Sequence, residues 1–312
     1  MKMLDIARIY VSVNINNDDT SSTAMRAARL FDERTGIGDI AEIDFAAIGR
    51  FKAAVLAVGK PVTYNGYLRY LKLLGKWALA EGYWTRNWFE SVRKLPEPDA
   101  PHKTIEPEVF AEAMKFLHSN EALQPAWFWR IVIRFLYFTG VRRRQIVHVQ
   151  LRDIDLTNRV LTASYRGSKT QREWQIPLAD EVIEDLRYLI RRNENVLGRR
   201  MRPDDYVFNV SRFYSRYKSD PARPGRMDGP QFTGFMKRLS ARIGMRIGMH
   251  RIRHTCATDL CDFDDDESPD LFAAQQILGH TMLSTTRGYV KTKVHRMRMQ
   301  INKLEFPKQG KI

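Results

Sequence analysis

A proline-rich segment near position 100 most strongly limits how this chain can fold. Prolines occupy positions 96, 98 and 101 within residues 94–103. Because proline fixes its own φ angle and lacks the N–H group that a helix needs, this spacing blocks a helix and favours an extended linker. The length of 312 residues also suits two domains better than one. We therefore predict domains at residues 1–98 and 104–312, joined by a linker at residues 99–103.

The N-terminal third of the chain has the pattern of a small helical domain. Apolar residues at helical spacing, bounded by glycines, predict helices at about residues 20–36, 40–58 and 63–80. Residues 1–20 alternate only weakly between polar and apolar types, so that a strand and an unstructured arm both remain open.

The third of these helices is expected to have two different faces. Its apolar stripe is predicted at Tyr67, Tyr70, Leu71, Leu74 and Trp77. On the other side lie three cations at helical spacing, namely Arg69, Lys72 and Lys76. Such charges usually form a solvated face, whereas a local excess of cations also suits contact with the phosphates of a nucleic acid. Both interpretations stay open from the sequence.

The overall charge indicates a polyanionic partner. Lys and Arg number 51 against 36 Asp and Glu, a formal net charge of +15. Residues 1–60 hold eight of each sign, whereas residues 101–312 hold 37 basic and 24 acidic residues. Such an excess is typical of nucleic-acid binding. Two cysteines are too few for a disulfide framework, which indicates the cytoplasm. No apolar run is long enough for a membrane helix, so we expect a soluble protein without a membrane partner. Together with the basic charge, this leads us to expect a nucleoid-associated protein.

Residues 249–260 predict a helix that carries two side chains suited to phosphate chemistry. The run contains neither glycine nor proline, and His250 and Arg253 lie three apart, so both side chains leave the same helix face. Arginine matches two oxygens of a phosphate, and histidine can exchange a proton near neutral pH. His280 comes next, and Tyr289 follows it by nine residues, after a segment that predicts a turn and a new helix start. A phenol needs nearby cations to act as a nucleophile.

The same helix also invites a zinc interpretation through His250, His254 and Cys256, because histidines one helical turn apart can share a metal ion. However, Arg251 stands where the zinc-protease motif has glutamate, and Arg253 would place a second cation beside the metal. Phosphate chemistry therefore fits these residues better than metal chemistry.

Two further cationic positions lie upstream. Residues 127–138 are so apolar that they predict a buried core helix, which a Thr-Gly pair breaks before the chain restarts with Arg142 in the first turn. Backbone N–H groups at such a helix N-terminus favour an anion. Residues 160–165 and 174–177 predict two short strands, and the turn between them contains Lys169.

Together these residues resemble the tyrosine recombinases, that is, the phage-integrase and Xer-like site-specific recombinases. The resemblance covers about residues 104–300 and, more loosely, the segment before them. It implies a fold that is mainly α-helical with a small antiparallel β-sheet in the C-terminal catalytic domain, preceded by an N-terminal helical core-binding domain. It assigns the six catalytic positions, in order, to Arg142, Lys169, His250, Arg253, His280 and Tyr289.

The function implied by the resemblance is site-specific DNA recombination (integration) through a 3′-phosphotyrosine, with no cofactor and no metal. The two arginines and His280 would hold the phosphate, while Lys169 would protonate the leaving oxygen and His250 would exchange a proton with Tyr289. Two alternatives stay open. A type IB topoisomerase shares the chemistry but needs one subunit on any duplex, and a non-catalytic DNA-binding protein on this scaffold could lose active-site groups.

The resemblance also implies partners. These are double-stranded DNA recombination sites, further copies of the chain in a homotetrameric synaptic complex, and accessory DNA-bending proteins as optional partners. A closing helix is predicted from apolar residues at intervals of four, three, four and three, namely Val290, Val294, Met297, Ile301 and Leu304. By default its apolar face packs on its own domain, but in the resembling family such a segment docks on a neighbouring subunit, which we expect here once DNA is bound.

Three features depart from the family pattern or stay ambiguous. Gln145 stands where the family usually has an acidic residue, and glutamine accepts a hydrogen bond without supplying a charge. The acidic loop at residues 261–270 is longer than expected and lacks the glycine and glutamate of a calcium-binding loop, so we interpret it as solvated. Residues 198–226 interleave basic and aromatic side chains, which fits either nucleic-acid contact or an ordinary loop with docked aromatics.

Overall fold

The computed structural model describes residues 1–14, 18–97, 103–164, 172–217, 225–262 and 270–290. The chain divides into two compact units, residues 1–100 and 101–312, and each has its own hydrophobic core. The division falls within the proline-rich segment. The assignment of a DNA-binding role to the first unit and a catalytic role to the second stays a prediction.

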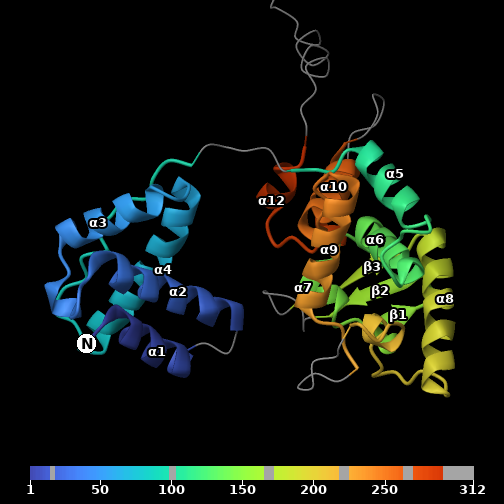
Figure 1. The fold of residues 1–312 in the computed structure, drawn as a ribbon, viewed down its shortest axis with the longest axis horizontal. Coiled ribbons are helices and arrows are strands. Elements are labelled where there is room, and N and C mark those ends of the chain that lie inside the picture. The colour runs from blue at the N-terminus through green and yellow to red at the C-terminus, as the bar shows by residue number, and fades with distance from the viewer. Residues whose placement is uncertain (15–17, 98–102, 165–171, 218–224, 263–269, 291–312) are drawn as a thin grey trace, which may run out of the picture. The chain divides into compact units, whose positions relative to one another are not determined.

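The described part of the N-terminal unit contains four α-helices that pack around one core (Figure 1). The elements are α1 (Met3–Asn14), α2 (Asp18–Thr35), a short 3₁₀ helix (Ile40–Glu42), α3 (Phe45–Leu56) and α4 (Pro61–Ala80). Helix α2 packs against the other three helices. Helices α2 and α4 confirm two of the helices predicted from glycine-bounded periodicity, to within two residues at each end.

Helix α1 corrects the expectation for the first residues. Met3, Ile6 and Ala7 are buried, and positions i, i+3 and i+4 lie on one face of a helix. A strand would place these residues on opposite faces, and an unstructured arm would leave them exposed. The prediction of a strand or an arm is wrong because the weak alternation lies C-terminal to the residues that carry the helical period.

The second predicted helix, residues 40–58, is two elements. Asp39 Oδ1 accepts a hydrogen bond from the backbone N–H of Ala41 at 2.9 Å and begins the 3₁₀ helix. Asp44 Oδ1 accepts one from the backbone N–H of Ala47 at 2.7 Å and begins α3. Each aspartate satisfies an N–H group that has no partner inside its helix. Two capping aspartates thus begin two helices where the apolar pattern alone predicts one.

Helix α4 buries a stripe that is rotated from the predicted one. Leu71 and Leu74 are buried as expected, whereas Tyr67, Tyr70 and Trp77 are only half-buried. The buried set extends along the helix and comprises Tyr64, Asn65, Leu68, Leu71, Leu74, Gly75 and Ala78. Small residues can face the core as well as large ones, so a stripe drawn through the aromatic residues leaves out Gly75 and Ala78 and misplaces the centre of the face.

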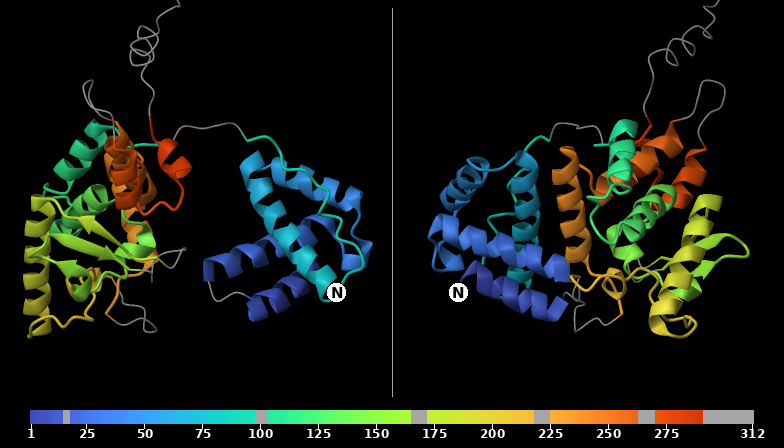
Figure 2. Two further views of the ribbon diagram at one scale, coloured as in Figure 1. Left: turned by 180° about the vertical axis from the view of Figure 1, so that it is seen from behind. Right: turned by 45° about the vertical axis from the view of Figure 1, so that its right-hand side comes forward.

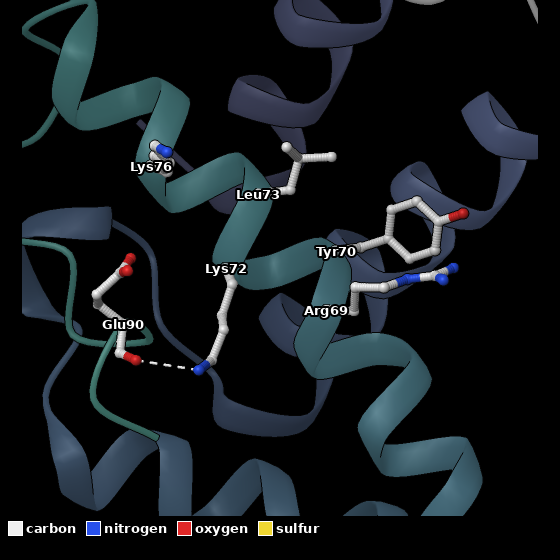
Figure 3. A pocket seen from close by; sticks show the side chains of 6 residues that line it. All are labelled: Arg69, Tyr70, Lys72, Leu73, Lys76 and Glu90. Carbon is white, nitrogen blue, oxygen red and sulfur yellow. Dashed lines mark hydrogen bonds between the residues drawn. The ribbon is translucent and has the colours of Figure 1, made fainter. Parts of the chain in front are cut away.

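The predicted cations of α4 line a hollow beside this helix (Figure 3). The hollow is lined by Arg69, Tyr70, Lys72, Leu73, Lys76 and Glu90. Lys72 Nζ donates a hydrogen bond to the backbone oxygen of Glu90 at 3.0 Å. The guanidinium carbon of Arg69 lies 4.9 Å from the centre of the Tyr70 ring. The three cations therefore share one accessible region, as both interpretations of the sequence require.

The C-terminal unit packs helices around a small sheet (Figures 1 and 2). Its described α-helices are α5 (Pro107–Phe116), α6 (Ala126–Thr139), α7 (Arg143–Ile146), α8 (Asp180–Leu197), α9 (Gly229–Ile243), α10 (Met249–Cys261), α11 (Leu271–Leu278) and α12 (Leu283–Arg287). Helix α6 packs against both α8 and α10, and most of its residues are buried, although Phe138 near its end is exposed. Its Trp129 stacks on Phe235 of α9 with ring centroids 3.8 Å apart. The prediction of a buried core helix is confirmed.

The described strands form one antiparallel sheet in the order β1 (Ile154–Asp155), β2 (Val160–Ala163) and β3 (Trp174–Pro177). Leu161 of β2 faces Ile176 of β3, and both are buried. This pairing confirms the two predicted strands, whereas Lys169 lies outside the described residues. Helix α11 packs against β3, so the sheet borders the segment that carries His280.

Three aromatic residues of the basic segment 198–226 pack against the core, and none of the three is fully exposed to solvent. Phe208 is fully buried, and Phe213 and Tyr217 are partly buried against the core of the C-terminal unit. The Phe213 ring lies 4.8 Å from that of Trp127. Of the two interpretations of residues 198–226, the docked loop therefore fits these three residues. Separately, none of the helices in the described ranges is both long and apolar enough to cross a membrane.

Candidate active site

Arg253 lies on helix α10, between the C-terminal ends of α6 and α11, and is only 4% exposed. Its Nη1 donates a hydrogen bond to the backbone oxygen of Gly140, just after α6. Its Nη2 donates one to the backbone oxygen of Leu278, the last residue of α11, at 2.7 Å. Carbonyl groups at a helix C-terminus lack partners within the helix and carry partial negative charge. They therefore stabilise the buried guanidinium, which ties both helix ends to α10.

Two glycines allow the helix ends to approach so closely. Gly140 and Gly279 follow α6 and α11 with φ angles of 58° and 59°, in the left-handed region that glycine adopts easily. A Cβ atom on Gly140 would lie 2.9 Å from a leucine side chain of α11, and one on Gly279 would lie 2.2 Å from the Trp174 ring. Trp174 also donates through Nε1 to the backbone oxygen of Ile277 at 3.1 Å. Strand β3 thereby fixes the residues that precede His280.

Gly279→Ala is expected to destabilise the C-terminal unit by about 2–5 kcal/mol, the sum of a left-handed alanine and an overpacked contact with Trp174. Urea unfolding followed by tryptophan fluorescence measures the change. Gly198→Ala is the matched control, because Gly198 has a φ of 63° but a Cβ there meets nothing within 4 Å. Equal losses in the two variants would contradict a structural role for the Trp174 contact.

Tyr289 follows α12 and is 6% exposed. Its Oη lies 2.9 Å from Nδ1 of His254, within hydrogen-bonding distance. The ring of His280 stacks on the Tyr289 ring at an interplanar angle of 13°, with centroids 5.9 Å apart. The ring of His250 contacts that of His254, with centroids 4.1 Å apart. The structure therefore gathers Arg253, His280 and Tyr289, and it links His250 to them through His254.

Both ring nitrogens of His280 are engaged. Nε2 lies 3.1 Å from Arg253 Nη2, and Nδ1 lies 3.0 Å from Thr286 Oγ1. A guanidinium can only donate hydrogen bonds, so Nε2 accepts in this arrangement and the proton of a neutral imidazole is on Nδ1. Thr286 is fully buried on α12, and its contact sets the orientation of the His280 ring.

The contact between His254 and Tyr289 is not predicted from the sequence. The sequence indicates His254 only as a candidate metal ligand. Its position one helical turn after His250 is a signal that both imidazoles share a face. That spacing does not show which of the two imidazoles contacts Tyr289. Tyr289 follows α12, and its position beside α10 depends on tertiary packing between segments that are distant in sequence. On α10, Arg253 is buried whereas His250, about one helical turn before it, is exposed. Residues on the same helix face can therefore differ in their access to solvent.

The electrostatic environment of Tyr289 contains opposing effects. Burial raises the pKa of the Tyr289 phenol, whereas the positive charges of Arg253 and Arg142 act to lower it. Burial lowers the pKa of Arg253 to about 10, and repulsion from Arg142 adds to that effect. Arg253 still carries its charge at neutral pH. A phenolate formed at Tyr289 would thus be stabilised by two guanidinium groups.

Arg142 occupies the N-cap position of α7 and is half-buried. Its backbone N–H donates to Oε1 of Gln145 at 2.9 Å. Gln145 therefore stabilises the turn that positions Arg142. The backbone N–H of Arg142 needs a hydrogen-bond acceptor there, and a neutral amide oxygen is sufficient. The Nε2 atom of Gln145 is buried and has no hydrogen-bond partner among the residues that the structure describes. Burial lowers the pKa of the Arg142 guanidinium, and Tyr289 acts in the opposite direction.

The residues considered for zinc serve other contacts. Burial raises the pKa of Cys256 to about 12, so its thiol stays protonated at neutral pH, and a protonated thiol is a poor metal ligand. His254 directs Nδ1 toward Tyr289. Across the described ranges, no group of three or more His, Cys, Asp or Glu side chains is placed to hold a metal ion.

Comparison with known protein sequences yields tyrosine recombinases. A Pseudomonas aeruginosa protein named among the XerC tyrosine recombinases is 26% identical over 272 residues, which cover 83% of this chain and 61% of that protein. Tyrosine recombinase XerA of Pyrococcus furiosus is 25% identical over 205 residues, or 65% of this chain and 63% of XerA. The chain thus spans about half to two-thirds of the length of the curated relatives that it matches first.

Solved structures show the same fold. The integrase of transposon Tn1549, in complex with a circular intermediate DNA, aligns with a TM-score of 0.75 at 18% identity, covering 97% of this chain and all of that one. A lambda integrase dimer bound to a COC′ core site aligns with a TM-score of 0.69 at 17% identity, covering 93% and 94%. The predicted fold class, mainly α-helical with a small antiparallel sheet, is confirmed.

The family assignment rests on a match over most of the chain. The model of the phage integrase family matches residues 103–296, which is more than half of the sequence and contains Arg142, Arg253, His280 and Tyr289. The chain therefore belongs to the phage integrase family, the tyrosine recombinases.

Proposed function

We propose that this protein is a site-specific recombinase that cleaves and rejoins DNA strands through a 3′-phosphotyrosine at Tyr289. The observation that carries the proposal is the placement of the Tyr289 phenol among two arginines and two histidines in a chain of this family. Phenol, guanidinium and imidazole groups supply a nucleophile, phosphate-binding cations and proton-exchanging groups.

In the proposed reaction, the oxygen of Tyr289 attacks a phosphorus atom of DNA, and the bond from phosphorus to the 5′ oxygen breaks. Arg142 and Arg253 stabilise the charge on the non-bridging oxygens. When Arg253 Nη2 turns from the imidazole toward the phosphate, His280 takes up a proton at Nε2, and this N–H donates a hydrogen bond to the phosphate. Lys169 protonates the departing 5′ oxygen. For rejoining, a 5′ hydroxyl attacks the phosphotyrosine and releases the tyrosine, so no external energy source is required.

The proposed partner is double-stranded DNA that carries recombination sites. The net charge of +15 favours a polyanion, and solved relatives of the same fold were captured with DNA. The face of α4 with Arg69, Lys72 and Lys76 is then a candidate contact for the DNA backbone (Figure 3). The finer proposals are a homotetramer on paired sites and accessory DNA-bending proteins.

The direct test is to incubate the protein with genomic DNA of the organism that encodes it, in excess EDTA, and to sequence the covalent protein–DNA junctions. A site-specific recombinase gives junctions at few sequences, each with protein on the 3′ phosphate. Junctions scattered over any duplex would instead indicate a topoisomerase, and retained binding without junctions would indicate a non-catalytic DNA-binding protein. Adducts that require added magnesium or zinc would contradict the metal-free mechanism.

The proposed tetramer uses the predicted closing helix, whose residues lie outside the described ranges from position 291 onward. Deleting residues 292–312 is expected to preserve binding to a single site while reducing the yield of two-site complexes, because it removes most of the apolar face that would dock on the neighbouring subunit. Gel shifts and crosslinking measure both quantities. Deleting only residues 307–312 spares the apolar positions and is the control. Tetramers at full yield in the longer deletion would show that the helix packs on its own subunit.

A further inference from the structure

The hydrogen bond between Tyr289 and His254 bears on which residue receives the phenolic proton. Tyr289 Oη lies 2.9 Å from Nδ1 of His254, and the two rings are tilted by 36° with centroids 5.5 Å apart. The imidazole nitrogen thus approaches the hydroxyl oxygen itself rather than the ring face. This is the distance at which a general base takes a proton from a nucleophile.

The other groups around the phenol are less suited to accept this proton. Arg142 and Arg253 are cations that only donate. His280 already accepts a hydrogen bond from Arg253 at Nε2, its Nδ1 lies 3.0 Å from Thr286 Oγ1, and its ring stacks on that of Tyr289. His250 is exposed, and its ring contacts the ring of His254.

We propose that His254, and not His250, receives the phenolic proton when Tyr289 attacks DNA. The inference rests on the proposed function, since it names the base of that same reaction. The Tyr289 O–H proton moves to Nδ1 of His254 while the tyrosine oxygen bonds to phosphorus. The electron pair of the broken bond stays on the 5′ oxygen, which takes its own proton from Lys169. His250 then supports the His254 ring through their contact and is a positioning residue.

The test uses a nicked duplex that contains a mapped junction, on which wild-type protein accumulates the covalent adduct. His254→Ala is expected to slow adduct formation by on the order of 10²–10⁴, the usual contribution of a general base, with DNA affinity unchanged. His254→Asn places a hydrogen-bonding atom near the position of Nδ1 but cannot take up a proton, so it should be about as slow as the alanine variant. Added imidazole should partly restore His254→Ala and leave His254→Asn unchanged.

These outcomes separate proton transfer from a structural role. If His254→Asn reacts at the wild-type rate, the side chain only positions the tyrosine and the proposal fails. If His254→Ala reacts faster than wild type, the hydrogen bond restrains Tyr289 and the proposal also fails. His118→Ala removes an exposed imidazole on the same unit and should react at the wild-type rate. A wild-type protein that forms no adduct on any DNA would overturn the proposed function itself.

A change of leaving group distinguishes the base from the acid. A substrate with sulfur in place of the bridging 5′ oxygen releases a thiolate, which needs no proton. Lys169→Ala should regain most of its adduct formation on this substrate, whereas His254→Ala should stay slow because the phenol must still lose its proton. Restoration of His254→Ala by the sulfur substrate would place His254 on the leaving-group side and overturn the proposal. A larger loss in His250→Ala than in His254→Ala would return the role to His250.

Discussion

Tyr289→Phe should abolish the covalent protein–DNA adduct while leaving DNA affinity nearly unchanged. The substitution removes one oxygen from a side chain that is 6% exposed, and it keeps the ring that stacks on His280. The lost hydrogen bond to His254 costs about 1 kcal/mol of folding free energy, which is too little to unfold a domain. Gel shifts measure binding, and SDS-resistant adducts on a nicked duplex measure cleavage.

Tyr137→Phe provides a matched control for this variant. Tyr137 also belongs to the C-terminal unit, and its hydroxyl donates to Asp259 at 2.8 Å, so the control removes the same atom and a comparable hydrogen bond. It should retain the adduct. An SDS-resistant adduct formed by Tyr289→Phe would show that another residue is the nucleophile.

Arg142→Ala and Arg253→Ala should each slow strand cleavage by two or more powers of ten, as expected when a donor to transition-state charge is lost. The two variants should differ in stability. Arg253→Ala leaves the carbonyl groups of Gly140 and Leu278 without their buried donor, so it should also destabilise the C-terminal unit by about 3–5 kcal/mol. Adduct yield at saturating protein and the thermal midpoint separate the two effects.

Arg212→Ala is the control for a purely structural arginine. Arg212 is partly buried, and it donates to Asn193 Oδ1 at 2.6 Å and to the backbone oxygen of Tyr206 at 2.8 Å. Its loss should lower the thermal midpoint while the surviving folded protein still cleaves DNA. If Arg142→Ala lowers cleavage only in proportion to the fraction that unfolds, then Arg142 does not act on the phosphate.

Features with a local signal could be predicted from the sequence. The continuous apolar run at residues 127–138 marks α6, since no exposed element tolerates so many large apolar side chains. Strands β2 and β3 are bounded by turn residues and alternate in burial, and α10 lacks any helix breaker. Strand β1 has only two residues, Ile154 and Asp155, which is too short for any alternation to be recognised.

The contacts within the site depend on tertiary structure and could not be predicted. Six residue types in family order indicate a candidate catalytic segment. However, the hydrogen bond between Tyr289 and His254 joins two segments whose approach depends on the packing of α10, α11 and α12. The role of Gln145 is similar. Its side chain caps the backbone of Arg142, so a residue that departs from the family pattern still meets the need for an acceptor.

The position of Arg253 changes what its presence in a sequence can reveal. Because this arginine joins the C-terminal ends of two core helices, selection for a stable fold alone is enough to preserve it. If the proposed recombination were lost in a descendant that kept this fold, Arg253 would be retained for the same reason, while Tyr289, whose hydroxyl contributes little to stability, would be free to drift. In this chain the arginine is therefore a marker of architecture, and the tyrosine is the better marker of the proposed activity.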